Sequence, residues 1–353
     1  MEELGYNEQI KKLMEAPDLA EFQAGRVIAE HRERYVVRTA EGELEAEVTG
    51  NLRFSAGSRL DFPAVGDWVA LAAHDPDFAI IHRVLPRSSV ITRQAVGQFG
   101  EVQVIAANVD HAFIVQAVDR DFNINRLERY LTICNASRVG PVIVLTKTDL
   151  TDAESVSEIV EKVKKRITNI PVIPLSNHTQ EGYSQIKELI RKGKTYSLLG
   201  SSGVGKSTLI NNLLGKTAMQ TGDISKSTGK GKHVTSHREL VILENGGILV
   251  DNPGMREVGI ADAGSGLEET FDVIHDVSNN CKYKDCTHVH EAGCAVREAI
   301  EKGDIDHAAY ENYLKMVKEK QHFETTAADK RKKEKLFGKI LKDYHKKNIK
   351  QKR

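Results

Sequence analysis

The chain has 353 residues, of which 40% are hydrophobic and 28% charged, and its 50 Lys and Arg balance 50 Asp and Glu. This composition is typical of a globular protein of roughly two or three domains, and the balanced charge argues against a basic nucleic-acid coat along the whole chain. The apolar runs are far shorter than the ~18 residues that a membrane helix needs, and residues 1–19 lack the apolar core of a secretory signal. We therefore expect a cytoplasmic protein without a membrane helix.

The pattern of residues 25–95 predicts short strands separated by turns. Apolar residues alternate with polar ones, as at Val27 and Ala29 or at Tyr35 and Val37, which is the period of a half-buried strand. Such strands close most simply into a small β-barrel. We predict an OB-fold, although the pattern alone fits another small barrel equally well. We assign residues 1–100 to an N-terminal extension and this barrel.

From residue 101 apolar strands alternate with amphipathic helices, which predicts an α/β domain with a mostly parallel sheet. The strands are expected at 111–118, 140–146, 171–176 and 195–200, and the helices at 125–136 and 154–167. A hairpin with its turn at 245–247 should add two antiparallel strands. We assign 101–265 to this domain, and 266–353 to a mostly helical domain with a basic tail.

Residues 200–207, GSSGVGKS, match the P-loop pattern and lie between a predicted strand and a predicted helix. The N–H groups of such a loop bind phosphate oxygens. Lys206 would reach the β- and γ-phosphates, and Ser207 would bind Mg²⁺. A glycine-rich turn with a solvated lysine is the alternative. The predicted nucleotide-binding residues are Gly200, Ser201, Ser202, Gly203, Val204, Gly205, Lys206, Ser207 and Thr208.

A second phosphate motif, ILVDNPG, follows about forty residues after the P-loop. Asp251 at the end of this apolar strand could approach Mg²⁺ through a water, and Gly254 could offer its N–H to the γ-phosphate. Between the two motifs, residues 222–240 are rich in Gly, Ser, Lys and His. We predict a switch segment there that phosphate and Mg²⁺ order, with a flexible linker as the alternative.

The switch segment offers three hydroxyl groups that could bind Mg²⁺. Thr235 is our first choice, and Ser236 and Thr228 are the alternatives. Many GTPases place a Gln directly after D-x-x-G to orient the attacking water, whereas this chain has Met255 there. We therefore predict slow intrinsic turnover. His233, His237 or a partner would supply the missing group, unless both histidines are solvated loop residues.

A guanine-reading loop is predicted at TKTD, residues 146–149. The carboxylate of Asp149 matches the N1–H and N2–H₂ donors of guanine, which adenine lacks. Thr146 and Lys147 would hold this loop, and the backbone N–H of Ser176 could meet the guanine O6. A lone T-K-x-D could also be a helix cap. The second loop at Ser176, which could also contact the base, favours GTP binding.

The guanine-reading loop precedes the P-loop along the chain, whereas an ordinary GTPase has the opposite order. Joining the old ends of a compact domain and cutting it elsewhere leaves the packing intact. We therefore predict a circularly permuted GTPase domain. In this order the segment that contacts the γ-phosphate continues directly into the C-terminal domain.

Three of the four cysteines lie within residues 281–294, a spacing that favours a metal over disulfides in a cytosolic chain. Three thiolates and an imidazole suit a closed, structural Zn²⁺ site. His290 is a conceivable substitute for the histidine ligand, because the step from the second cysteine is short. The predicted ligands are Cys281, Cys286, His288 and Cys294.

Residues 329–353 contain 12 Lys and Arg but only 3 Asp and Glu. Such a run is usually a solvated helix face, but beside a domain that senses nucleotide we favour contact with rRNA phosphates.

These motifs in this order resemble the circularly permuted bacterial GTPases called ribosome small subunit-dependent GTPase A. The matching segments are VGDWV, TKTD, GSSGVGKST, GKGKHVTSHREL, DNPG and CKYKDCTHVHEAGCAV. The resemblance implies an OB-fold, a permuted GTPase domain, a zinc domain, and late maturation of the small ribosomal subunit with subunit-stimulated hydrolysis. Two departures are Asn252, where the family usually has Thr, and HVTSH, which is less rich in threonine.

We therefore expect a monomeric GTP-hydrolysing assembly factor that binds the small ribosomal subunit and its rRNA. An RNA-binding module that only senses guanine nucleotide, with incidental hydrolysis, is the alternative. A P-loop kinase is a third hypothesis, but it would prefer ATP, and Asp149 argues against it.

Overall fold

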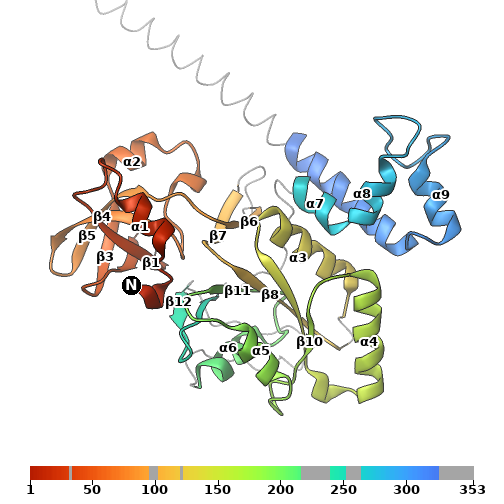
Figure 1. The fold of residues 1–353 in the computed structure, drawn as a ribbon, viewed down its shortest axis with the longest axis horizontal. Coiled ribbons are helices and arrows are strands. Elements are labelled where there is room, and N and C mark those ends of the chain that lie inside the picture. Colours follow the sequence, from red (N-terminus) through yellow and green to blue (C-terminus); the bar gives the residue numbers. More distant parts are fainter. Residues whose placement is uncertain (32–33, 95–101, 120–121, 216–238, 252–263, 326–353) are drawn as a thin grey trace, which may run out of the picture.

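The computed structural model describes residues 1–31, 34–94, 102–119, 122–215, 239–251 and 264–325. A β-barrel, a central sheet covered by helices, and a smaller group of helices follow one another along the chain (Figure 1). Within these ranges, no helix combines the length and the apolar character needed to cross a membrane.

The N-terminal strands form the closed OB-like barrel that the sequence predicts. The strand order is β1-β2-β3-β5-β4, and β4 pairs back with β1. Alternate side chains such as Val27, Val37 and Ile81 are fully buried inside it. Helix α2 (Gly50–Ser55) and the 3-10 helix η2 (Arg59–Asp61) lie between β3 and β4. The strands are β1 (Gln23–His31), β2 (Arg34–Arg38), β3 (Glu43–Val48), β4 (Trp68–Asp75) and β5 (Phe78–Val84).

Arg26 of β1 joins the barrel to the central sheet. Its side chain is 1% exposed, and it donates to the Gly66 carbonyl at 3.2 Å and to Thr195 Oγ1, at the start of β11, at 2.8 Å. It also donates to the Leu4 carbonyl. Burial lowers the pKa of this guanidinium to about 10. Strand β1 additionally pairs with β12 of the central sheet, so the barrel and the sheet are continuous.

The sequence analysis did not predict several short elements. Asn7 caps α1 by accepting from the Ile10 N–H at 3.1 Å. Strands β6 and β7 form a separate antiparallel hairpin between the barrel and the sheet. The missed elements are η1 (Glu2–Leu4), α1 (Glu8–Met14), α2 (Gly50–Ser55), η2 (Arg59–Asp61), β6 (Val90–Gln94), β7 (Val102–Ala107), η3 (Thr148–Leu150) and α5 (Tyr183–Leu189).

The central sheet has the order β10-β9-β8-β11-β13-β12, and every neighbouring pair is parallel except β13 and β12. The α/β domain and its antiparallel hairpin are therefore present as predicted. The strands are β8 (His111–Ala117), β9 (Gly140–Thr146), β10 (Val172–Pro174), β11 (Thr195–Leu199), β12 (Glu239–Ile242) and β13 (Ile248–Asp251).

Helices cover both faces of this sheet. The face that carries Ile114 and Ile143 packs with α3 (Ile124–Ala136) and α4 (Ala153–Arg166). The face that carries Phe113 and Val144 packs with α5 and with α6 (Lys206–Leu214). The chain thus runs outward from β8 to β10 with helices on one face, and returns to β11 over the other face.

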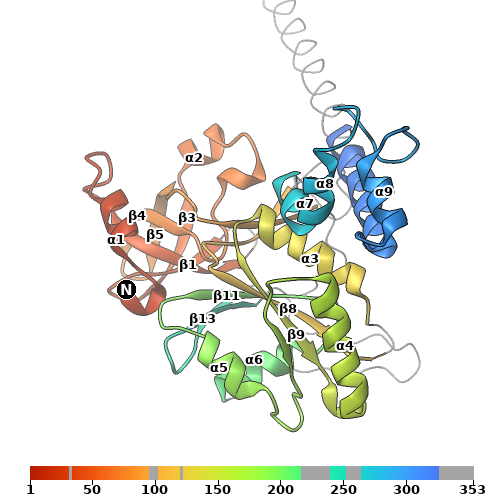
Figure 2. The ribbon, with the colours of Figure 1, turned by 45° about the vertical axis from the view of Figure 1, so that its right-hand side comes forward.

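The C-terminal helices pack on α3, as Figures 1 and 2 both show. A Cβ at Gly266 of α7 would lie 2.2 Å from the Thr132 carbonyl, so α7 approaches α3 closely. Leu267, Phe271 and Ile274 are buried together. The helices are α7 (Gly264–Thr270), α8 (Asp272–Ser278), α9 (Ala295–Lys302) and a helix over 307–325.

The domain boundaries remain predictions. The boundary between residues 100 and 101 falls between the paired strands β6 and β7, and the boundary at 265 falls inside α7.

Candidate functional site

The carboxyl ends of β8, β9 and β11 lie at one edge of the sheet. Successive strands extend in opposite directions from the point between β8 and β11. Ligands of open α/β sheets bind at such a switch point, beside the carboxyl ends of the strands. The predicted P-loop follows β11 and the predicted guanine-reading loop follows β9, so the fold brings the two motifs to this edge.

The P-loop has the backbone that its glycines allow. Gly200 has φ +151°, and a Cβ there would lie 2.2 Å from the Val115 carbonyl oxygen. Gly203 and Gly205 also have positive φ, at +81° and +95°. This left-handed region favours glycine. Helix α6 begins at Lys206 directly after the loop, and the N–H groups of its first turn form an anion-binding end.

Lys206 is folded onto the loop. Its side chain is buried, and Nζ donates to the carbonyls of Gly200 at 2.7 Å and Ser201 at 2.6 Å. Tyr130 of α3 hydrogen-bonds Ser201, and burial raises the pKa of the Tyr130 phenol. The ammonium is thus held within the loop that phosphates would enter.

Replacing Gly200 by Ala should strongly weaken nucleotide binding, because the new Cβ has no room beside the Val115 carbonyl. The control is Gly42→Ala: Gly42 has nearly the same φ, +150°, but no atom lies within 4 Å of the added Cβ. We expect GTP affinity to fall by at least ~100-fold in Gly200→Ala, as for overpacking of about 3 kcal/mol. Calorimetric titration with GTP would show it, and equal affinities of the two variants would contradict the steric argument.

The guanine-reading loop is bonded directly to the P-loop. Thr146 is fully buried, and its hydroxyl donates to the Val204 carbonyl at 2.6 Å. Lys147 has a left-handed backbone, with φ +63°, and its Nζ lies 3.0 Å from Asp119 Oδ2. The two loops therefore have a fixed relative position, although 58 residues separate the bonded pair.

Ser176 makes hydrogen bonds within its own loop, and its predicted contact with the guanine O6 stays a prediction. Its N–H donates to the Glu181 carbonyl at 3.1 Å, so this group is already used within its own loop. The Ser176 hydroxyl instead donates to Asp149 Oδ1 at 2.7 Å and accepts from the N–H groups of His178 and Thr179. Ser176 therefore orients the carboxylate that we assign to guanine. Asp149 itself is exposed at the edge of the site.

Asn177 was missed by the sequence analysis. Its side chain donates to the Gly205 carbonyl at 3.1 Å and accepts from the Tyr183 hydroxyl at 2.7 Å. Asn212 of α6 donates to the Asn177 carbonyl at 2.9 Å. These bonds join the loop after β10 to the P-loop. A polar residue beside Ser176 was the only sequence signal for this contact.

Several predicted residues lie outside the described part of the chain. They are His233, Thr235, His237 and Gly254. The alternatives Thr228 and Ser236, the residues Asn252 and Met255, and the basic tail also lie outside it. The backbone of Asp251 ends β13, where this residue pairs with Glu239.

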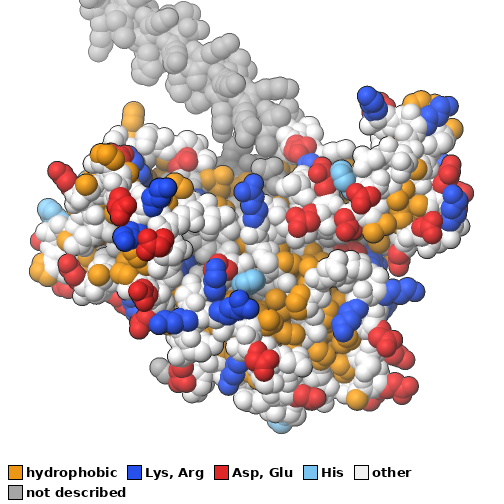
Figure 3. Space-filling view, in the orientation of Figure 1, with side chains coloured by type: hydrophobic (Ala, Val, Ile, Leu, Met, Phe, Trp, Pro, Cys, Tyr) orange, Lys and Arg blue, Asp and Glu red, His pale blue; other side chains and the backbone are white. Residues whose placement is uncertain are grey.

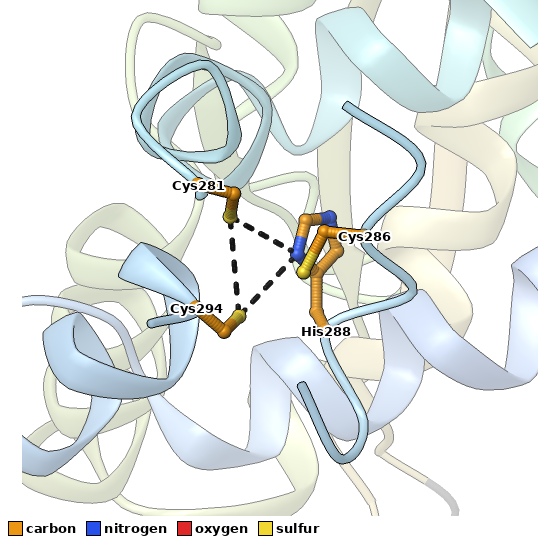
Figure 4. Close-up of side chains that lie close together, drawn as sticks. All are labelled: Cys281, Cys286, His288 and Cys294. Carbon is orange, nitrogen blue, oxygen red and sulfur yellow. Dashed lines mark hydrogen bonds between the residues drawn. The ribbon is translucent and has the colours of Figure 1, made fainter. Parts of the chain in front are cut away.

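The four predicted metal ligands lie together, with their side chains pointing toward one another (Figure 4). His288 Nδ1 is 3.6 Å from Cys281 Sγ and from Cys294 Sγ, and these two sulfurs are 3.9 Å apart. All four ligand atoms lie within 4.8 Å of one another. Ligands around a tetrahedral Zn²⁺ are separated by about 3.5–3.8 Å. The cluster can therefore hold a metal ion, and burial lowers the pKa of His288, which favours its neutral, ligating form.

The P-loop and the predicted guanine-reading loop meet at one edge of the sheet. Strand β9, which leads into the guanine-reading loop, precedes β11, which leads into the P-loop. Together with the OB-like barrel and the Cys₃His cluster, this arrangement defines a circularly permuted GTPase.

Comparisons with known proteins give the family. The family model described as RsgA GTPase matches residues 84–261. A model described as ABC transporter matches residues 183–351; both spans include the P-loop, which many nucleotide-binding proteins share. The Small ribosomal subunit biogenesis GTPase RsgA 1 of Bacteroides thetaiotaomicron is 38% identical over 344 residues, which cover 97% of this chain and 96% of that protein.

Solved structures have the same fold. The crystal structure of YjeQ from Thermotoga maritima has a TM-score of 0.62 and 27% identity, covering 84% of this chain and 98% of that chain. YloQ, described as a circularly permuted GTPase, has a TM-score of 0.59 and 22% identity, with 85% and 96% covered. The chain therefore belongs to the RsgA GTPase family.

Proposed function

We propose that this protein hydrolyses GTP in the late maturation of the small ribosomal subunit, binding the subunit with GTP and leaving it after hydrolysis. It would act as a cytoplasmic monomer. The Bacteroides relative is named as a small ribosomal subunit biogenesis GTPase, which supports this proposal. The observation that carries it is the Thr146–Val204 bond, which holds a guanine-type loop against a P-loop.

Each loop would bind a different part of the nucleotide or its Mg²⁺. Asp149, oriented by Ser176, would accept from guanine, and the P-loop N–H groups and Lys206 would bind the phosphates. Ser207, together with Thr235 and Asp251, would hold Mg²⁺, which neutralises phosphate charge. Gly254 would contact the γ-phosphate, and His233 or His237 would orient the attacking water, either alone or with a group from the subunit.

The test of this proposal is GTP-dependent binding. In sedimentation with isolated small subunits, the protein should pellet with a non-hydrolysable GTP analogue and stay in the supernatant with GDP. The large subunit is the control. Equal pelleting with both nucleotides, or with both subunits, would contradict the proposal.

We further propose that the Cys₃His cluster binds one structural Zn²⁺ per chain. His288→Ala should remove a ligand, so the metal content should fall well below one and the C-terminal helices should lose stability. His290→Ala is the matched control, because His290 is exposed and lies two residues away, outside the cluster. Elemental analysis of both variants would decide which histidine binds the metal. Zinc loss in His290→Ala but not in His288→Ala would identify His290 as the ligand.

A further inference from the structure

Gln116 is a buried amide in an otherwise apolar part of the sheet. It lies near the carboxyl end of β8, is 3% exposed, and alternates with Ile114 and Val118, which belong to the core beside α3. Strands that are buried on both faces of a parallel sheet are normally continuous apolar runs. Polar side chains otherwise gather on the surface, where acidic and basic groups are interspersed over the face drawn in Figure 3. A glutamine at this interior position therefore needs a physical reason.

The Gln116 amide is only half used. Its Nε2 donates to the Asn123 carbonyl at 3.2 Å, whereas Oε1 has no hydrogen-bond partner among the residues that the structure describes. A buried acceptor without a partner costs free energy, which an apolar side chain of the same length would not. The Asn123 carbonyl does not depend on the amide, because it also accepts from the Arg126 N–H at 3.1 Å. We therefore expect Gln116 to make no net contribution to the stability of the fold.

The bond to Asn123 closes the connection between β8 and α3. Asn123 is the N-cap of α3, and its side chain accepts from the Asn125 N–H at 2.9 Å. The seven positions from Gln116 to Asn123 span Asp119, whose Oδ2 lies 3.0 Å from Lys147 Nζ. Both charged side chains are mostly buried, so water screens this ion pair only in part. The amide thus fixes the segment that carries the partner of Lys147.

Lys147 belongs to the guanine-reading loop and lies two positions before Asp149. Its left-handed backbone, with φ +63°, costs free energy for a residue other than glycine and persists only where neighbouring groups hold it. The main chain of Gln116 contacts the same loop, because its carbonyl accepts from Thr146 Oγ1 at 3.4 Å. Gln116 therefore reaches the loop twice, directly through the strand and indirectly through Asp119.

We propose that Gln116 is a positioning residue for guanine recognition. Its amide fixes the connection between β8 and α3, so that Asp119 holds Lys147 in its left-handed conformation and Asp149 lies where the base binds. Gln116 acts through these side chains and not by contact with the base. The inference rests on the proposed function, in which this loop binds guanine.

The test is Gln116→Met in the full chain, which removes the amide and nearly keeps the length of the side chain. GTP and GDP should both bind about tenfold more weakly, as expected if the loop has its binding conformation in about a tenth of the molecules. ATP lacks the donors that Asp149 accepts, so its affinity should stay unchanged and the preference for GTP should fall by the same factor. Competition titrations measure these affinities. The free energy of unfolding in urea should equal or exceed that of wild type, because no buried group loses its only partner.

Gln103→Met is the matched control. Gln103 Oε1 accepts from Arg93 Nε at 3.1 Å and from Nη2 at 3.0 Å within the β6–β7 hairpin, so the same substitution removes a bonded amide from another strand. Its nucleotide affinities should equal those of wild type. Asp119→Asn is a second variant, at a partly exposed side chain. It should lower GTP affinity as Gln116→Met does, and the double variant should bind no more weakly, because both changes act on one contact.

Wild-type GTP affinity in Gln116→Met would overturn the inference. A lower free energy of unfolding in Gln116→Met, together with wild-type GTP affinity in Asp119→Asn, would also overturn it, because the amide would then be a structural group of the core. Failure of the proposed guanine recognition is distinguished by the wild-type titration alone. Wild type would then bind ATP as tightly as GTP, and the inference would fail with it.

Discussion

Asp149→Asn should weaken GTP binding by about 10²-fold or more. The substitution replaces one acceptor by a donor facing the N1–H and N2–H₂ of guanine, and sites built around such bonds reject a mismatched partner strongly. The Ser176 hydroxyl, which donates to Asp149 Oδ1 at 2.7 Å, would keep the new side chain in place. Xanthosine triphosphate, with an oxygen at C2, should bind the variant better than GTP does. Competition titrations with the two nucleotides measure both effects.

Asp152→Asn is a suitable control for the Asp149 variant. Asp152 is a nearby exposed carboxylate that caps α4 by accepting from the Ser155 N–H at 2.8 Å, so its loss should leave nucleotide choice unchanged. Unchanged GTP affinity in Asp149→Asn would mean that TKTD serves only as a local cap.

Arg166→Ala should destabilise the protein by roughly 3–5 kcal/mol, because it leaves the buried Glu128 carboxylate without its cationic partner. Arg166 Nε and Nη2 lie 2.6 and 2.8 Å from the two oxygens of Glu128, and both side chains are almost fully buried. Asn312 of the C-terminal helix donates to the same carboxylate at 2.5 Å. The cluster joins α3, α4 and the C-terminal helices. The midpoint of urea denaturation measures the loss.

Arg129→Ala is the matched control for Arg166→Ala. Arg129 makes an equally short two-bond pair with Glu319, at 2.7 Å each, but both side chains are about a third exposed. Such a pair contributes about 0–1 kcal/mol. Equal destabilisation by the two variants would show that burial of Glu128 does not decide the effect.

The destabilisation in Arg166→Ala should also depend on pH, because Glu128 titrates. Burial raises the pKa of Glu128, and the Arg166 guanidinium opposes that rise. In Arg166→Ala the pKa of Glu128 should rise further above its unfolded value. The destabilisation should then be largest above the folded pKa, where the carboxylate is charged, and should shrink as the pH falls and the group protonates.

The sequence predicted the elements whose requirements are local. The P-loop glycines have the positive φ that the motif requires, and the alternation at Val27 and Val37 matches the barrel interior. The four metal ligands, 13 positions apart at most, also came together as predicted. The roles of these site residues in binding GTP and metal remain proposals.

The missed features depend on contacts that are distant in sequence or on the geometry of a particular turn. The Glu128–Asn312 bond joins residues 184 positions apart, and no local pattern indicates it. The hydrogen bond from the Ser176 N–H to the Glu181 carbonyl depends on the turn between these residues, which the sequence pattern does not indicate. The β6–β7 hairpin is short and packs through tertiary contacts, so its strands carry little periodic signal. The position of Asn177 against Gly205 likewise follows from the packing of two loops.

GTP hydrolysis measured with isolated small subunits, with large subunits, and with neither is the most direct test of the proposed function. We predict turnover well below ~1 per second for the protein alone, because no glutamine follows D-x-x-G. Small subunits should accelerate it by about 10²-fold or more, as an added catalytic group does, and large subunits should leave it unchanged. Equal rates in all three conditions, or fast turnover by the protein alone, would contradict the account.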